Sequence, residues 1–144
     1  MLNTQDTARF LERVPLFQTL GRRQLELLAK RAVERDFPAG AIIVTQGRGG
    51  EGLFIVIQGK AEAVRERQDG ERVTVNQFGP TDFFGELALL DDGPRTASVI
   101  AVEPTRCLVL SRWDFLAEVR QDAEMAVLVL QELAKRFRLA LEAM

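Results

Sequence analysis

Short apolar runs separated by turn residues occupy the middle of the chain, and longer stretches with helical spacing occupy both ends. Ten of the 11 glycines lie between Gly40 and Gly93, so this middle part is rich in turns. Between the turns lie short β-branched or apolar runs: AIIV (41–44), LFIVI (53–57), RVTVNQF (72–78), SVIAV (98–102) and CLVL (107–110). Short strands at this spacing, with turn signals between them, are typical of an all-β sandwich or barrel.

One pair of strands is predicted as a hairpin. The dipeptide Asp69-Gly70 favours a tight turn, because glycine accepts the positive φ that such a turn requires. The two strands of the hairpin are expected at residues 60–67 and 71–78.

The N-terminal part reads as helical. Apolar residues recur there at helical spacing with charged residues between them: Leu25, Leu28, Ala29, Ala32 and Val33. Before them, VPLFQTLG (14–21) contains a proline among apolar residues and predicts a tight turn packed on the core.

The C-terminal part predicts two helices. Ser111 with Asp114 resembles an N-cap pair, and Asp122 can cap a second helix. Within 122–144, apolar residues step by four, three, four, three and four: Ala126, Leu130, Leu133, Phe137, Ala140 and Met144. This heptad-like seam fits a helix that lies on the strands, and it fits equally a helix that pairs with its twin in a homodimer.

The length of 144 residues suits a single domain spanning residues 1–144. Within it we expect an N-terminal helical segment (1–36), a β-region (37–110) and C-terminal helices (111–144). The fold class is therefore mainly β with flanking α-helices.

Composition removes several classes of function. The formal charge of −2 argues against attraction of the whole surface to nucleic acid or to an anionic membrane. Cys107 is the single cysteine and histidine is absent, so histidine-based catalytic sites and the usual zinc, haem and cluster sites are not expected. We predict no catalytic residues, no metal and no cofactor. No apolar run reaches the roughly 20 residues of a membrane span, and the start is not a signal peptide, so a cytoplasmic protein is expected.

The segment 84–99, FGELALLDDGPRTASV, carries the candidate chemistry. Gly85 precedes Leu87–Leu90, which can form one or two helical turns whose first amides lack intrahelical partners. Arg95 lies nine residues after Glu86, behind a turn that can bring it back to those amides. An arginine there can give a phosphate two parallel hydrogen bonds.

Neighbouring residues refine this anion site. The amides of Thr96 and Ala97 can also donate to an anion bound by Arg95 and the first amides of the helical turn. Glu86 is unfavourable beside an anion unless it meets a donor, and a sugar hydroxyl supplies one. The residues therefore predict a site for a ribose phosphate.

The same segment resembles the phosphate-binding cassette of cyclic-nucleotide-binding domains. The resemblance includes FGELAL, the nine-residue interval between glutamate and arginine, and PR-x-A. It extends to VPLF near the start, to PAG-x-I-I followed by QG at 38–47, and to the strand ending in QG at 53–59. It implies a β-roll of the jelly-roll type and a regulatory module that binds cAMP or cGMP and signals through its C-terminal helix.

The resemblance also implies a role for each residue of the cassette. Glu86 would accept from the ribose 2′-hydroxyl, with Gly85 allowing that approach. Arg95 would pair with the exocyclic phosphate oxygens, and Leu87, Ala88 and Thr96 would offer amides. Some members of the family that accept cGMP hold a threonine at the position of Thr96, and so do some that prefer cAMP, so the choice of base stays open.

Two departures from the family limit what is carried over. The stretch around Ala140 and Leu141 is apolar, whereas the catabolite activator protein reads the adenine with polar residues of its long helix. Hydrophobic capping of the base fits this sequence better. No helix-turn-helix motif is visible in these residues, so no direct DNA binding is expected. The alternative function is a roll that serves as a scaffold and binds no nucleotide.

Overall fold

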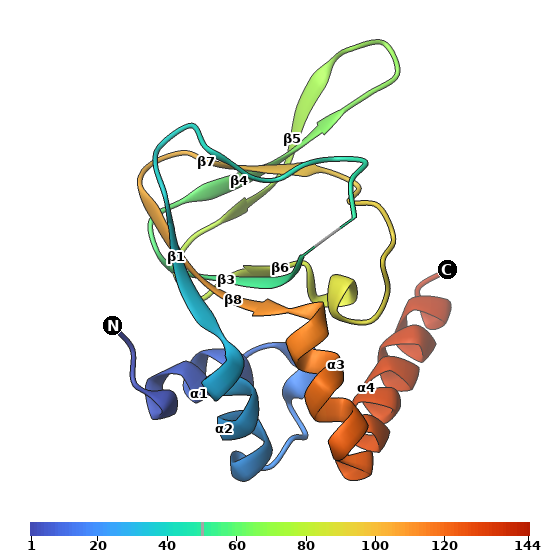
Figure 1. The fold of residues 1–144 in the computed structure, drawn as a ribbon. Helices are drawn as coiled ribbons and strands as arrows, with labels where there is room; N and C mark the ends of the chain where they lie inside the picture. Colours follow the sequence, from blue (N-terminus) through green and yellow to red (C-terminus); the bar gives the residue numbers. More distant parts are fainter. Residues whose placement is uncertain (50) are drawn as a thin grey trace. The chain divides into compact units, whose positions relative to one another are not determined.

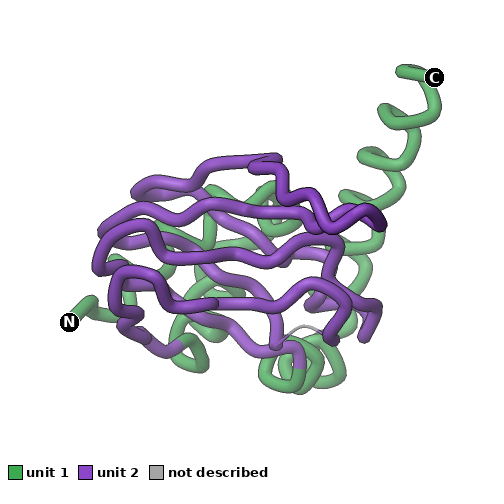
Figure 2. The backbone as a smooth tube through the Cα atoms, turned by 90° about the horizontal axis from the view of Figure 1, so that it is seen from above, with its two compact units in different colours: residues 1–32, 113–144 green, residues 33–112 purple. Residues whose placement is uncertain are grey.

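A computed structural model describes residues 1–49 and 51–144. The chain forms two compact units (Figure 2). Unit 1 comprises residues 1–32 and 113–144, and unit 2 comprises residues 33–112. Unit 1 is mainly helical and unit 2 is mainly β.

Unit 1 is built from helices at the two ends of the chain. They are α1 (Thr4–Glu12), the 3₁₀ turn η1 (Pro15–Phe17), α2 (Arg22–Arg31), α3 (Arg112–Gln121, whose first residue belongs to unit 2) and α4 (Ala123–Glu142). The predicted turn at VPLF is η1. Asp122 caps α4 as predicted, because its side chain accepts a hydrogen bond from the amide of Met125.

Each of these elements contributes buried apolar side chains to the core of the protein. Phe17 of η1 packs against Phe115 of α3 with ring centroids 5.8 Å apart. An ion pair connects two helices at the edge of this core, where the guanidinium of Arg31 lies 2.7 Å from Glu118 and 3.1 Å from Asp114. These contacts join segments that are more than 80 residues apart in the sequence.

Helix α4 packs through a different face from the predicted seam. Its buried residues are Met125, Val129 and Glu132. Leu130 and Phe137 of the seam are 63% and 67% exposed within this single chain. The apolar character of α4 therefore extends over two faces, one of which is packed while the other faces solvent.

Unit 2 consists of two antiparallel sheets of four strands each (Figure 1). One has the order β1-β8-β3-β6 and the other the order β2-β7-β4-β5. The strands are β1 (Val33–Phe37), β2 (Ile42–Val44), β3 (Gly52–Gln58), β4 (Ala61–Glu66), β5 (Arg72–Phe78), β6 (Phe83–Phe84), β7 (Ser98–Ala101) and β8 (Thr105–Ser111). The mainly β fold with flanking helices is confirmed.

The predicted hairpin is also confirmed. Strands β4 and β5 pair from Ala61 with Phe78 to Glu66 with Arg72, and Gly70 adopts a φ of 85° in the turn between them.

One prediction was wrong at the boundary of the helical segment. Ala32 and Val33 were expected to continue α2, but the helix ends at Arg31 and Val33 begins β1. Val33 pairs with Val109 of β8 in an antiparallel register that runs to Phe37 and Thr105. Pairing with a strand about 75 residues away decides this segment, and helical periodicity alone carries no information about such a partner.

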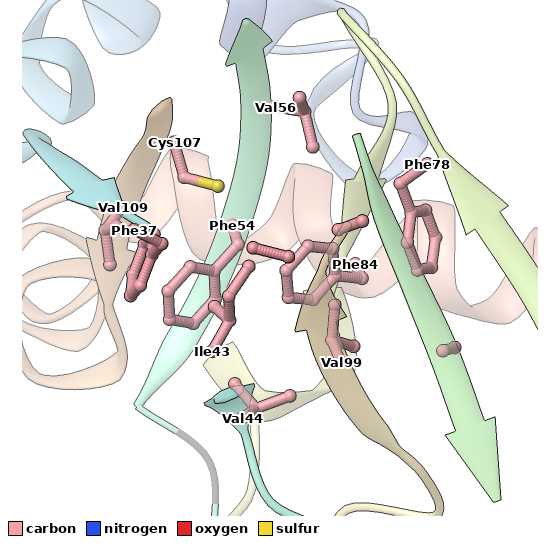
Figure 3. Packing of buried hydrophobic residues seen from close by; sticks show 13 residues of the cluster. Phe37, Ile43, Val44, Phe54, Val56, Phe78, Phe84, Val99, Cys107 and Val109 are labelled. Atoms are coloured by element: carbon pink, nitrogen blue, oxygen red, sulfur yellow. The ribbon is translucent and has the colours of Figure 1, made fainter. Parts of the chain in front are cut away.

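The core of unit 2 receives side chains from both sheets. Four phenylalanines form a chain of ring contacts through it (Figure 3). Phe54 stacks on Phe84 at 5.2 Å, Phe84 meets Phe78 at 5.0 Å, and Phe37 meets Phe54 at 6.4 Å. Phe84 immediately precedes Gly85, so this core anchors the start of the candidate cassette.

Cys107 belongs to the same core and is fully buried. Burial raises the pKa of its thiol from 9.0 to about 12. Because a rise of this size leaves roughly a thousandfold less thiolate at pH 8, we expect the native protein to react with a thiol reagent at least about a thousandfold more slowly than the unfolded chain. Absorbance of the group that the reagent releases on reaction measures the rate for the native protein and the rate for the unfolded chain. Rapid labelling of the folded protein would contradict this burial.

Candidate cyclic-nucleotide site

The cassette begins where β6 ends. Residues Phe83 and Phe84 pair with β3, and Gly85 then turns the chain with a φ of 84° into the 3₁₀ turn η2 (Glu86–Leu89). A Cβ atom at Gly85 would collide with Nη1 of Arg95 and with the carbonyl oxygen of Gly52. This position needs glycine for its backbone conformation and for the close approach of the arginine.

Arg95 is held by its backbone and by its side chain. Its amide donates to the carbonyl of Arg48 and its carbonyl accepts from the amide of Gly47, both at 2.8 Å. Its Nη2 atom donates to the carbonyl of Gly52, also at 2.8 Å. These contacts fix the guanidinium beside the start of η2.

The guanidinium of Arg95 retains capacity to bind an anion. The residue is half-buried, and its Nε atom is buried without a hydrogen-bond partner among the residues that the structure describes. Burial lowers the pKa of Arg95, while the nearby carboxylate of Glu51 acts to raise it. An arginine stays protonated even so, and a buried N–H group that lacks an acceptor favours a ligand that supplies one.

Six of the seven predicted site residues line one cleft of about 440 Å³: Gly85, Glu86, Leu87, Ala88, Arg95 and Thr96. The turn residues Asp91, Gly93 and Pro94 complete the wall with Phe83. The seventh, Ala97, packs its side chain against the core of unit 2 and is absent from this lining, which leaves its backbone amide as its candidate group at the site.

The amides of η2 are not all available. The amide of Ala88 donates to the carbonyl of Gly85 at 3.1 Å. A 3₁₀ turn makes its first hydrogen bond one residue earlier than an α-helix does, which the sequence pattern did not specify. A ligand at Ala88 would therefore share an amide that already donates to the carbonyl of Gly85. The amide of Leu87 comes one position before this first hydrogen-bonded amide of the turn.

Sequence reasoning missed the residues that hold Arg95. Gly52 offers its carbonyl from a φ of 148°, and a Cβ at that position would meet the carbonyl of Leu110. Gly47 and Arg48 form backbone hydrogen bonds with Arg95. The glycines at positions 47, 49 and 52 were a visible signal, but only the folded chain shows that these three contact the cassette.

The arrangement has the chemistry of an oxyanion-binding site with a carboxylate beside it. A cation, the start of a 3₁₀ turn and Glu86 share one cleft, and Oε2 of Glu86 is buried. No group of three or more acidic residues or cysteines that could hold a metal ion occurs in the described part of the chain. The fold and the site define a β-roll module with a cleft whose lining includes an arginine and a glutamate.

The comparisons with known proteins give this module its family. Residues 34–122 match the model of the cyclic nucleotide-binding domain. The chain is 38% identical over 124 residues to the cyclic AMP receptor protein of Thermus thermophilus, covering 86% of this chain and 57% of that protein. The chain belongs to the cyclic nucleotide-binding domain family.

Two solved structures agree with this assignment. The N-terminal domain of a transcriptional regulator from Streptomyces coelicolor superposes with a TM-score of 0.86 at 32% identity, covering 94% of this chain and 96% of that one. The regulatory domain of Toxoplasma gondii PKA, solved with cAMP, gives a TM-score of 0.74 at 27% identity, with coverages of 94% and 49%. By name, these relatives are receptors and regulators.

The match with the receptor protein leaves part of that relative uncovered, because the chain spans 57% of its length.

Among the helices that the structure describes, none has the length and apolar character that crossing a membrane requires.

Proposed function

We propose that this chain binds cAMP or cGMP in the cleft of the cassette and acts as a regulatory module. The observation that carries the proposal is the half-buried guanidinium of Arg95, whose Nε atom is buried and has no acceptor among the described residues. The cyclic phosphate would accept hydrogen bonds from this guanidinium and from the amides of Leu87, Thr96 and Ala97, with that of Ala88 shared. The Toxoplasma structure with cAMP supports this choice of ligand.

Calorimetric titration with cAMP and with cGMP tests the proposal directly. The protein should first be unfolded, dialysed and refolded, so that any co-purified ligand is removed. We expect binding in the micromolar range or tighter, and weaker binding of the non-cyclic 5′-AMP. If the refolded and intact protein binds neither cyclic nucleotide, the roll is a scaffold and the proposal fails.

The base preference would depend partly on Thr96, which is exposed and lines the cleft. Replacing it with alanine and repeating both titrations measures its contribution. A selective loss of cGMP affinity would support a contact with guanine. An unchanged ratio of the two affinities would show that Thr96 takes no part in base recognition.

The proposed role of Glu86 gives a prediction about the ribose. Its carboxylate would accept a hydrogen bond from the 2′-hydroxyl, so Glu86→Ala should weaken cAMP binding by about 10- to 150-fold, the worth of a hydrogen bond to a charged group. The same substitution should leave the affinity for 2′-deoxy-cAMP nearly unchanged, because that analogue lacks the donor. An equal loss for both nucleotides would contradict the assignment.

Occupancy of the site would be passed on through α4. The helix follows the β-unit in sequence and has apolar side chains on two faces. Hydrogen exchange of residues 122–144 with and without cAMP tests this relay. Increased protection of these residues with ligand would support the relay. Identical exchange with and without ligand would show that α4 does not transmit the signal.

The exposed face of α4 would pair with a second copy of the chain. Leu130 and Phe137 lie two turns apart on the seam and are mostly exposed. Sedimentation should show a dimer that Leu130→Ser with Phe137→Ser dissociates. The neighbouring pair Gln131→Ser with Arg138→Ser is the matched control, since both residues are exposed and lie outside the seam. A monomeric unsubstituted protein would contradict the pairing.

A further inference from the structure

Three segments of unit 2 meet around the backbone of Arg95 and Thr96. They are residues 46–48 after β2, residues 65–66 at the end of β4, and residues 95–96 of the cassette. The first contact is the pair of 2.8 Å hydrogen bonds by which Arg48 and Gly47 hold the amide and the carbonyl of Arg95. The position of Arg95 therefore depends on what holds residues 46–48.

The side chain of Gln46 fastens this segment to β4. Its Nε2 atom donates to the carbonyl of Glu66 at 3.0 Å, and its Oε1 atom accepts from the amide of the same residue at 2.8 Å. The carboxamide thus takes the place that a peptide group of a neighbouring strand would occupy. The amide of Gln46 also donates to the hydroxyl of Ser98 at 2.9 Å.

Arg65 closes the connection on the other side. Its Nε atom donates to the carbonyl of Thr96 at 3.2 Å. The peptide that follows is planar and trans, so the N–H of Ala97 points away from that carbonyl. By holding one end of the peptide group, Arg65 fixes the direction of the amide at the other end.

We propose that Gln46 and Arg65 are positioning residues of the phosphate site. They close a ring of hydrogen bonds through residues 46–48, 65–66 and 95–96, and this ring holds Arg95 and the Ala97 amide in place before the ligand arrives. The proposal rests on the proposed binding of a cyclic nucleotide. A segment that is already ordered avoids the entropic cost of ordering on binding, so the ring raises affinity without touching the ligand.

The test combines exchange in the ligand-free protein with affinity. In Gln46→Ala, the amides of Gly47 and Arg95 should exchange faster by NMR, because the segment that pairs them has lost its anchor. Binding of cAMP should weaken by about 2- to 12-fold for each hydrogen bond removed. Arg65→Ala should also weaken cAMP binding within this range, and Arg65→Lys should recover part of the loss.

Controls separate this role from a general effect on folding. Gln46→Met keeps the length of the side chain and makes neither hydrogen bond, so it should behave like Gln46→Ala. Gln77→Ala and Arg72→Ala remove exposed side chains of β5 and should change neither exchange nor affinity. Thermal unfolding identifies any variant that fails to fold.

The outcomes are distinct. Faster exchange at Gly47 and Arg95 together with weaker binding supports the proposal. Unchanged affinity of the Gln46 and Arg65 variants, in a protein whose unsubstituted form binds cAMP, overturns it. If the unsubstituted protein binds no cyclic nucleotide, the proposed function fails and the positioning role fails with it, while the exchange data still report whether the ring exists.

Discussion

Arg95→Ala is expected to weaken cAMP binding by about 30-fold to several thousandfold. Loss of one partner from a desolvated charge pair costs roughly 2–5 kcal/mol, which corresponds to this range of affinity. The fold should be little affected, because the arginine has an unsatisfied buried N–H group in the described structure and makes one side-chain hydrogen bond, to the carbonyl of Gly52. Calorimetry gives the affinity and chemical denaturation gives the free energy of unfolding.

Arg95→Lys is the informative comparison for this result. Lysine keeps the charge but cannot give two parallel hydrogen bonds, so its affinity should lie between those of the unsubstituted protein and Arg95→Ala. A near-normal affinity of Arg95→Ala, with the protein folded, would show that Arg95 does not bind the phosphate. A large loss of stability would show that the guanidinium serves the fold instead.

The second large effect is expected at Gly85. In Gly85→Ala, the added Cβ would meet Nη1 of Arg95 and the carbonyl of Gly52, so the guanidinium must leave its position. We expect cAMP affinity to fall by about 10- to 100-fold, or roughly 1.4–2.7 kcal/mol. A further cost of about 1–2 kcal/mol in the free energy of unfolding arises because alanine disfavours a positive φ.

The chain contains matched controls for the backbone part of this effect. Gly40 and Gly70 have a φ of 85°, nearly that of Gly85, yet a Cβ at either would meet nothing within 4 Å. Alanine at either position should therefore lower stability by about 1–2 kcal/mol and leave cAMP binding unchanged. If all three variants lose the same affinity, the collision with Arg95 is not the cause.

The sequence predicted most of the β-structure because strands and turns leave local signals. The hairpin around Asp69-Gly70 and the strand at 98–101 follow from β-branched runs that end at turn residues. Strand β1 escaped prediction, since VERDF alternates with charges and pairs with β8 far along the chain. The two-residue strand β6 is too short to show any periodicity.

The candidate site divides in the same way. The cassette residues could be named because they are contiguous and their spacing has a physical meaning. The groups that hold them could not, because Gln46 and Arg65 act through backbone atoms of distant residues. A side chain that binds a carbonyl or an amide leaves no trace in the identity of the residue it binds, so only the folded chain reveals it.

The burial of Cys107 has a practical consequence for observing this protein at work. With the native thiol shielded and its pKa raised to about 12, dyes can be attached to introduced cysteines without first removing the natural one. Exposed positions such as Arg72 in unit 2 and Lys135 in unit 1 would accept a donor and an acceptor fluorophore. Energy transfer between them would then follow the distance between the two units, molecule by molecule, as nucleotide is added.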